Sequence, residues 1–179
     1  MGGRILDYLH ARGEALDITA PSPVKAVYVN ARGVDWENPD VVVRTMADAG
    51  VSMIILAFYL SDLGAVDLPG VWEKMTPARQ IAAVAYAHAR GAVVLVSAGG
   101  STDLPYLVMN GSTLGHNVAT WAVANNLDGV DFDLENFGQG FAYEPLTEAQ
   151  TIQWVVDASI AARNVLCAQR FITHAPQVR

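Results

Sequence analysis

Four acidic residues lie close together in the segment DGVDFDLE, at positions 128–135. Asp131, Asp133 and Glu135 alternate there with apolar residues. Residues two apart on a β-strand point to the same face, so this spacing predicts three carboxyl groups along one side of a strand. Neighbouring Cα atoms in that row would be within about 7 Å of each other. The apolar alternate residues are expected to pack on the opposite face.

A row of carboxyl groups of this kind is suited to acid–base catalysis. Like charges in a low dielectric raise one another's pKa values, so three buried acids do not all stay ionised cheaply. A carboxyl that stays protonated near neutral pH is what a general acid needs to protonate a glycosidic oxygen. Two other interpretations remain open: carboxylates solvated on a half-exposed strand, and oxygen ligands for a metal ion. We favour the hydrolytic acid–base cluster.

Five apolar runs predict the strands that position these acids, and their continuity indicates strands covered on both faces, as in parallel sheets. The runs are Val24–Asn30, Ser52–Tyr59, Ala92–Ser97, Gly129–Glu135 and Phe171–His174. We expect Asp128, just before the fourth run, to be structural and to accept backbone N–H groups near the strand start.

Four helices are predicted between the strands from their terminal residues. Asn38-Pro39 opens the first, which ends at Gly50, and Thr76-Pro77 opens the second, which ends at Gly91. The third covers His116–Asn126, and a capping-box pattern at residues 147–150 opens the fourth. The expected apolar faces are Ile81, Val84, Ala85 and Ala89 in the second helix and Ile152, Val155, Val156 and Ile160 in the fourth.

Strands that alternate with helices every 30 to 40 residues or so indicate βαβ units and a parallel α/β sheet. Both a doubly wound sheet and a (β/α)8 barrel fit this order. The first strand lacks the Gly-rich phosphate loop that usually marks the doubly wound type. We expect one domain over residues 1–179, with an amphipathic segment at 1–20 and the strands and helices at 21–179.

The acidic segment resembles the DGxDxDxE motif of glycoside hydrolase family 18, which includes chitinases and endo-β-N-acetylglucosaminidases. Two further segments are similar to those of the family: Ser97-Ala98-Gly99-Gly100 resembles its SxGG motif, and Ala175-Pro176-Gln177 resembles the APQ segment of chitinase-like members. The three matches occur in the family's order and at its spacing. The resemblance implies a TIM-type (β/α)8 barrel, of which this chain supplies about the first five βα units.

The same resemblance implies a retaining, substrate-assisted mechanism without cofactor or metal ion. Glu135 would protonate the glycosidic oxygen. Asp133 would orient the substrate's 2-acetamido group, which attacks the anomeric carbon, and Asp131 would share a proton with Asp133. The implied substrate is a β-1,4-linked N-acetylglucosamine chain or the chitobiose core of N-glycans.

Residues near the predicted strand ends are candidates for sugar binding. Aromatic side chains stack on sugar faces, which suggests Tyr28 and Phe58, with Trp36 and Tyr59 as further candidates. Gly99 and Gln177 complete the expected substrate-binding set. Ser97 is expected to act near the site through packing and hydrogen bonds.

Other functions remain possible. A carbohydrate-binding, lectin-like protein on the same scaffold would need no hydrolysis, although such proteins usually lack the final glutamate, which Glu135 supplies here. A metal-dependent barrel lyase would need further ligands on neighbouring strands, and none stands out at Tyr28, Phe58 or Ser97. Because the chain stops soon after the fifth predicted strand, we expect a second polypeptide or a second copy to complete the barrel.

Composition limits the remaining classes. The net charge of -7 over 179 residues argues against nucleic-acid binding, because an acidic surface repels phosphates. The only cysteine, Cys167, precludes an intrachain disulfide and is expected to be buried. The N-terminal residues have neither a signal-peptide pattern nor a membrane span, which predicts a cytoplasmic protein unless a leader was removed.

Overall fold

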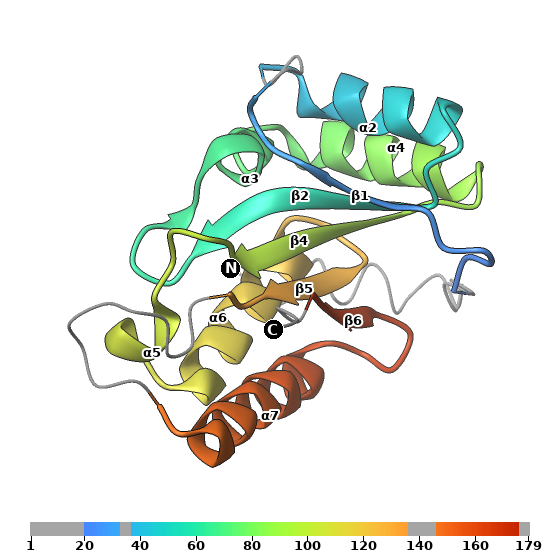
Figure 1. The fold of residues 1–179 in the computed structure, drawn as a ribbon. Coiled ribbons are helices and arrows are strands. Elements are labelled where there is room, and N and C mark those ends of the chain that lie inside the picture. The colour runs from blue at the N-terminus through green and yellow to red at the C-terminus, as the bar shows by residue number, and fades with distance from the viewer. Residues whose placement is uncertain (1–19, 33–36, 136–145, 176–179) are drawn as a thin grey trace.

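The computed structural model describes residues 20–32, 37–135 and 146–175. Their main feature is a parallel sheet in the order β1-β2-β4-β5-β6, shown in Figure 1. A short strand, β3, pairs antiparallel with β2. All five predicted strands are confirmed, and β3 was not predicted. The strands are β1 (Ala26–Val29), β2 (Met53–Leu60), β3 (Gly64–Ala65), β4 (Val93–Gly99), β5 (Gly129–Asp133) and β6 (Phe171–His174).

The four predicted helices are present, together with two short helices that the sequence did not indicate. The third predicted helix begins at Gly111 rather than His116, because the side chain of Asn110 accepts the N–H of Thr113 and caps it there. The capping box at Thr147 and Gln150 is confirmed. The helices are α2 (Pro39–Asp48), α3 (Asp67–Trp72), α4 (Pro77–His88), α5 (Pro105–Val108), α6 (Gly111–Ala124) and α7 (Glu148–Val165).

The predicted apolar faces of α4 and α7 are largely wrong, although Val84 is buried and Val155 packs against the core as expected. In α4 the buried residues are Gln80, Ala83, Val84 and Ala87, and in α7 they are Trp154, Ala158 and Ala162. Gln80 is buried because its side-chain amide donates to the carbonyl of Trp72 and to Asn125 Oδ1. Close backbone packing selects alanine over larger side chains on these helices. Ile81, Ile152, Val156 and Ile160 are exposed instead.

Two glycines explain the close packing of α6 against α7. A Cβ atom at Gly111 would lie 2.0 Å from the carbonyl oxygen of Trp154. One at Gly115 would lie 2.0 Å from that of Ala158. Because real Cβ atoms do not approach so closely, only glycine at these two positions allows the backbones of α6 and α7 to lie against each other. Cys167, beyond the end of α7, is exposed, which corrects the expectation that it is buried.

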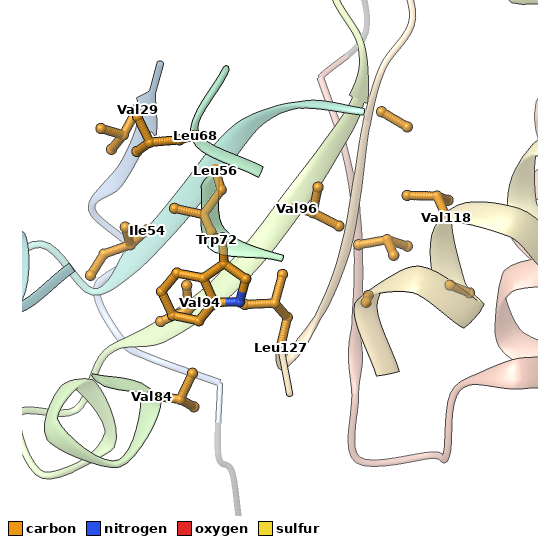
Figure 2. Packing of buried hydrophobic residues seen from close by; sticks show 14 of the residues in the cluster. Val29, Ile54, Leu56, Leu68, Trp72, Val84, Val94, Val96, Val118 and Leu127 are labelled. Carbon is orange, nitrogen blue, oxygen red and sulfur yellow. The ribbon is translucent and has the colours of Figure 1, made fainter. Parts of the chain in front are cut away.

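The helices pack against one face of the sheet, and the main core lies between them. Ile54, Leu56, Val94, Val96 and Phe132 face this layer from alternate strand positions. Figure 2 shows Trp72 within this cluster. Its indole is fully buried and its Nε1–H donates to the carbonyl of Asn125.

The opposite face of the sheet is curved inward. Met53, Ile55, Val93 and Leu95 form a second buried cluster there. The hydroxyl of Tyr28 on β1 lies 2.8 Å from Asp131 on β5, although β2 and β4 lie between them. In a flat sheet three strand spacings would separate the two backbones by about 14 Å, so the strands must roll toward one another. The sheet is therefore part of a barrel, open between β1 and β6 in the described residues.

No helix in the described ranges is long and apolar enough to cross a membrane. The predicted amphipathic segment at 1–20 lies almost wholly outside those ranges, as do Trp36 and Gln177.

Candidate active site

The three alternating acids lie at the carboxyl end of β5, on the concave face. Asp131 is only 1% exposed, whereas Asp133 and Glu135 are partly buried. Val130 and Phe132 point the other way, into the core beneath the helices. The predicted alternation is confirmed as far as Asp133, where β5 ends; Glu135 lies two residues beyond the strand, not on it as expected.

Three hydroxyl groups hold the carboxylate of Asp131. Tyr28 and Ser97 each donate to Oδ2 at 2.8 Å, and Thr173 donates to Oδ1 at 2.6 Å. The donors come from β1, β4 and β6. Ser97, Asp131 and Thr173 are direct partners in the parallel ladder, so they form one row across three strands. These three hydrogen bonds fix the orientation of the Asp131 side chain.

Asp133 is the acid whose pKa is shifted toward neutral pH. Burial, the charge of Glu135 and the charge of Asp131 together raise the pKa of Asp133 to about 6. Burial and the neighbouring Asp131 also raise the pKa of Tyr28, which keeps its hydroxyl protonated as a donor. The expectation that closely spaced acids raise one another's pKa is therefore met at Asp133. A carboxyl with such a pKa can take up or release a proton under physiological conditions.

Two glycines fix the backbone beside Asp133. The N–H of Gly100 donates to the Asp133 carbonyl oxygen at 2.7 Å. A Cβ on Gly99, whose φ is +110°, would lie 2.2 Å from that same oxygen. Gly99 is thus required by the close approach of β4 to β5. Its predicted role in substrate binding stays a prediction.

Aromatic residues predicted to bind sugar fall into two places. The Phe58 ring lies 6.5 Å from that of Tyr28, centroid to centroid, and packs over Gly100. Of these two residues, Tyr28 contacts the acids, through its hydroxyl. Tyr59 instead packs with Trp121 beneath the helices, with ring centroids 6.0 Å apart, so it does not join the acids as expected.

Asp128 lies before β5 and is 3% exposed. Its Oδ2 accepts the backbone N–H of Val94 at 2.7 Å, and its carboxylate also pairs with His88 Nε2 at 2.9 Å. The prediction that Asp128 accepts a backbone N–H near the strand start is therefore confirmed. This carboxylate joins β4, β5 and α4.

Sequence reasoning missed Thr173 and the donor role of Tyr28. The sequence indicates Tyr28 as an aromatic surface for stacking on sugar and Thr173 as one residue of a strand. The alternation on Phe171–His174 indicates which residues share a face, but the sequence does not reveal the register that pairs Thr173 with Asp131. Within the described ranges, no three His, Cys, Asp or Glu side chains are grouped so that they could hold a metal ion.

Comparisons with known proteins relate this geometry to solved structures. A glycoside hydrolase family 18 chitinase from Pseudoalteromonas aurantia aligns with a TM-score of 0.60 and 24% identity, over 84% of this chain and 54% of its own. A xylanase-alpha-amylase inhibitor protein, solved with trehalose, aligns with a TM-score of 0.52 and 18% identity, over 87% of this chain and 57% of its own. Concanavalin B aligns with a TM-score of 0.52 and 15% identity, over 89% of this chain and 58% of its own.

No family model and no curated protein sequence matches the chain. The chain spans a little over half the length of these solved structures. The identities are low, so the likeness is one of fold. The parallel sheet, its curvature and these alignments establish that the chain has a partial (β/α) barrel of the type found in family 18 chitinases.

Proposed function

We propose that this chain provides the catalytic acids of a family 18 type glycoside hydrolase. Its substrate is a β-1,4-linked N-acetylglucosamine chain or the chitobiose core of N-glycans. The observation behind this proposal is the row of Asp131, Asp133 and Glu135 at the carboxyl end of β5, where barrel enzymes place their catalytic groups. The chitinase-like scaffold supports the same function.

In the proposed reaction, Glu135 protonates the glycosidic oxygen while the substrate's own acetamido oxygen attacks the anomeric carbon. The glycosidic bond breaks and an oxazolinium ion forms. Water then opens this ion as Glu135, now a base, takes the proton from that water, which gives retention of configuration. The enzyme supplies no nucleophile, so the remaining acids must stabilise a developing positive charge.

Asp133 is suited to bind the acetamido group during this reaction. Its pKa of about 6 gives both protonation states substantial populations near neutral pH. A protonated Asp133 can accept from one neighbour and donate to another, whereas Asp131 is held by its three hydroxyl partners.

A carbohydrate-binding protein without hydrolysis is the alternative function. It is supported by the structural similarity to an inhibitor protein that was solved with trehalose. The presence of Glu135 favours hydrolysis, because a binding protein has no need of a general acid at this position. The two functions predict different effects when that carboxyl is removed.

We also propose that further βα units cover the open edges of the sheet in the working protein, supplied by a second polypeptide or a second copy. β1 and β6 each pair on one side only among the described strands. The exposed apolar residues Ile152, Val156 and Ile160 on α7 support the same proposal. Light scattering on the purified chain tests it: a stable monomer of 19.1 kDa would contradict it.

The decisive experiment measures release of a fluorophore from chitobiose and chitotriose glycosides. We expect Glu135→Gln to lower turnover by about 100-fold or more, because general acid catalysis contributes roughly that much. Chitooligosaccharide binding, measured by calorimetry, should be retained. Activity that survives the substitution would disprove the assignment of the acid. Binding without turnover in the unsubstituted protein would establish the carbohydrate-binding alternative.

A further inference from the structure

A buried pair of side chains, Ser61 and Asp103, joins the segments that follow β2 and β4. The Ser61 hydroxyl donates to Asp103 Oδ1 at 2.5 Å, and the Ser61 backbone N–H donates to Oδ2 at 3.0 Å. Asp103 is 5% exposed and Ser61 is 7% exposed, so water competes little for these bonds. Because each carboxylate oxygen accepts a hydrogen bond from the same residue, the pair fixes both the position and the orientation of the Asp103 side chain.

Asp103 closes a turn that begins at Gly100. Its backbone N–H donates to the Gly100 carbonyl oxygen at 3.1 Å, which is the hydrogen bond of a β-turn. The N–H of Gly100 in turn donates to the Asp133 carbonyl oxygen at 2.7 Å. The turn at residues 100–103 is therefore attached to the end of β5 at its first residue and to the end of β2 at its last.

The backbone of Asp133 depends on this turn because it lies at the end of the strand ladder. β5 pairs with β4 as far as Gly99 and Asp133, whereas its pairing with β6 ends at Phe132. The bond from Gly100 thus holds the Asp133 backbone one residue beyond the end of the β6 ladder. On the other side, a Cβ atom at Gly100 would lie 3.2 Å from the Phe58 ring, so the turn is closely packed there as well.

We propose that Ser61 and Asp103 are positioning residues that hold Asp133 in place through the turn at residues 100–103. They act through Gly100 and not on the reacting atoms. A small displacement of a group that must orient a substrate for attack lowers the rate strongly, since misplacement by about 1 Å can lower it about 100-fold. The effect on turnover rests on the proposed glycosidase function, whereas the effect on the turn does not.

Three variants test this arrangement. Ser61→Ala removes the hydroxyl donor and keeps the backbone donor. In Asp103→Asn the amide oxygen can still accept, but the amide nitrogen cannot, so one of the two bonds is lost. Asn110→Ala is the matched control: Asn110 Oδ1 also accepts the backbone N–H and the hydroxyl of one residue, Thr113, but at the start of α6.

The first measurement is amide hydrogen exchange by nitrogen-15 NMR, with the amides inside β4 as the internal reference. We expect the Gly100 amide to exchange about tenfold faster, relative to that reference, in Ser61→Ala and in Asp103→Asn, because a hydrogen bond to a carboxylate is lost at the turn. In Asn110→Ala its relative exchange rate should equal that of the unsubstituted chain.

The second measurement is the hydrolysis assay. We expect kcat to fall about tenfold in both variants of the pair, with KM changed less than about twofold, because Asp133 is misplaced for the chemical step while the binding surface is retained. In Asn110→Ala both constants should stay unchanged. A general loss of stability would instead lower the amount of active protein in the control as well.

Each outcome decides the proposal. A relative exchange rate of Gly100 that is unchanged in the variants of the pair would overturn it, as would an equal acceleration in Asn110→Ala. Faster exchange with an unchanged kcat would show that the turn does not position Asp133. If one variant of the pair does not fold, the other decides. If the unsubstituted chain shows no hydrolysis, the proposed function fails, while the exchange rates still determine whether the pair holds the turn.

Discussion

The hydroxyl of Tyr28 donates a hydrogen bond of 2.8 Å to Oδ2 of Asp131, across 103 positions of sequence. The two residues lie on β1 and β5, with two strands between them. This bond therefore links strands that do not pair, and it depends on the curvature of the sheet. It also stabilises a carboxylate that is almost fully buried.

Removing this hydroxyl should destabilise the fold measurably. We expect Tyr28→Phe to lower the free energy of unfolding by about 1–2 kcal/mol, since hydrogen bonds to buried charged groups contribute more than neutral ones. Urea denaturation measures the change. Tyr86→Phe is the matched control, because Tyr86 also donates to a carboxylate, Asp48, but at an exposed position. If the two substitutions lowered the free energy of unfolding equally, the burial of Asp131 would not strengthen its hydrogen bond with Tyr28.

The raised pKa of Asp133 predicts a pH-dependent stability. Its folded-state pKa of about 6 lies above the usual value of about 3.9, so folding favours the protonated form. The stability associated with protonation is fully present below about pH 4 and is lost as the pH rises through about 6. Asp133→Asn, which cannot ionise, should thus be more stable than the unsubstituted chain at about pH 8, by roughly 1–2 kcal/mol.

Denaturation curves at several pH values check this expectation. The advantage of Asp133→Asn should shrink to near zero by about pH 4, where the natural carboxyl is protonated as well. Asp131→Asn is the contrasting variant: its amide nitrogen cannot accept a hydroxyl proton, so we expect it to be destabilised. An advantage of the Asp133 variant that does not vary with pH would show that ionisation is not its cause.

Gly99→Ala should be strongly destabilising. The added Cβ would lie 2.2 Å from the carbonyl oxygen of Asp133, and the positive φ adds backbone strain. Together these effects should lower the free energy of unfolding by about 3 kcal/mol and displace Asp133 from its position beside Gly100. Thermal unfolding measures the loss.

Gly50→Ala separates the two contributions to that cost. Gly50 also has a positive φ, of +79°, but no atom lies within 4 Å of its added Cβ. We expect only the strain cost there, about 1–2 kcal/mol. If both alanine variants lost the same stability, the contact with Asp133 would have no energetic role.

Gly115→Ala should reverse the usual effect of that substitution within a helix. Alanine normally stabilises a helix relative to glycine by about 1 kcal/mol. In α6 the new Cβ would lie 2.0 Å from the carbonyl oxygen of Ala158, so α7 would have to move away. We expect a net loss of about 1–3 kcal/mol. Thermal unfolding measures the change, and Thr120→Ala, on the exposed face of the same helix, is the control, which should leave the melting temperature unchanged or slightly raised. A Gly115→Ala variant that is more stable than the unsubstituted chain would contradict the close packing of α6 on α7.

The helix faces show where local patterns mislead. Ile81 and Ile152 were expected to be buried because they are apolar and suitably spaced, yet both are exposed. Gln80 is buried because Trp72, in the preceding helix, and Asn125, 45 positions away, satisfy its amide. A helical periodicity indicates that a helix has two faces. It does not reveal which face meets small residues such as Gly111 and Gly115 on a neighbouring helix.

The sequence by itself determined the five parallel strands, the capping box that opens α7 and the alternation of the acids on β5. These features depend on residues a few positions apart, through the two-residue period of a strand and the local bonds of a helix start. Asp131 and Asp133 therefore had to share a face of β5 wherever that strand lay.

Only the tertiary structure decided which groups meet those acids. The parallel register places Ser97 and Thr173 beside Asp131, and the rolled sheet lets Tyr28 reach the same carboxylate. Strand register and sheet curvature result from packing between segments far apart in the chain, so no local pattern encodes them. The raised pKa of Asp133 is a consequence of that packing, because burial, its largest cause, exists only in the folded chain.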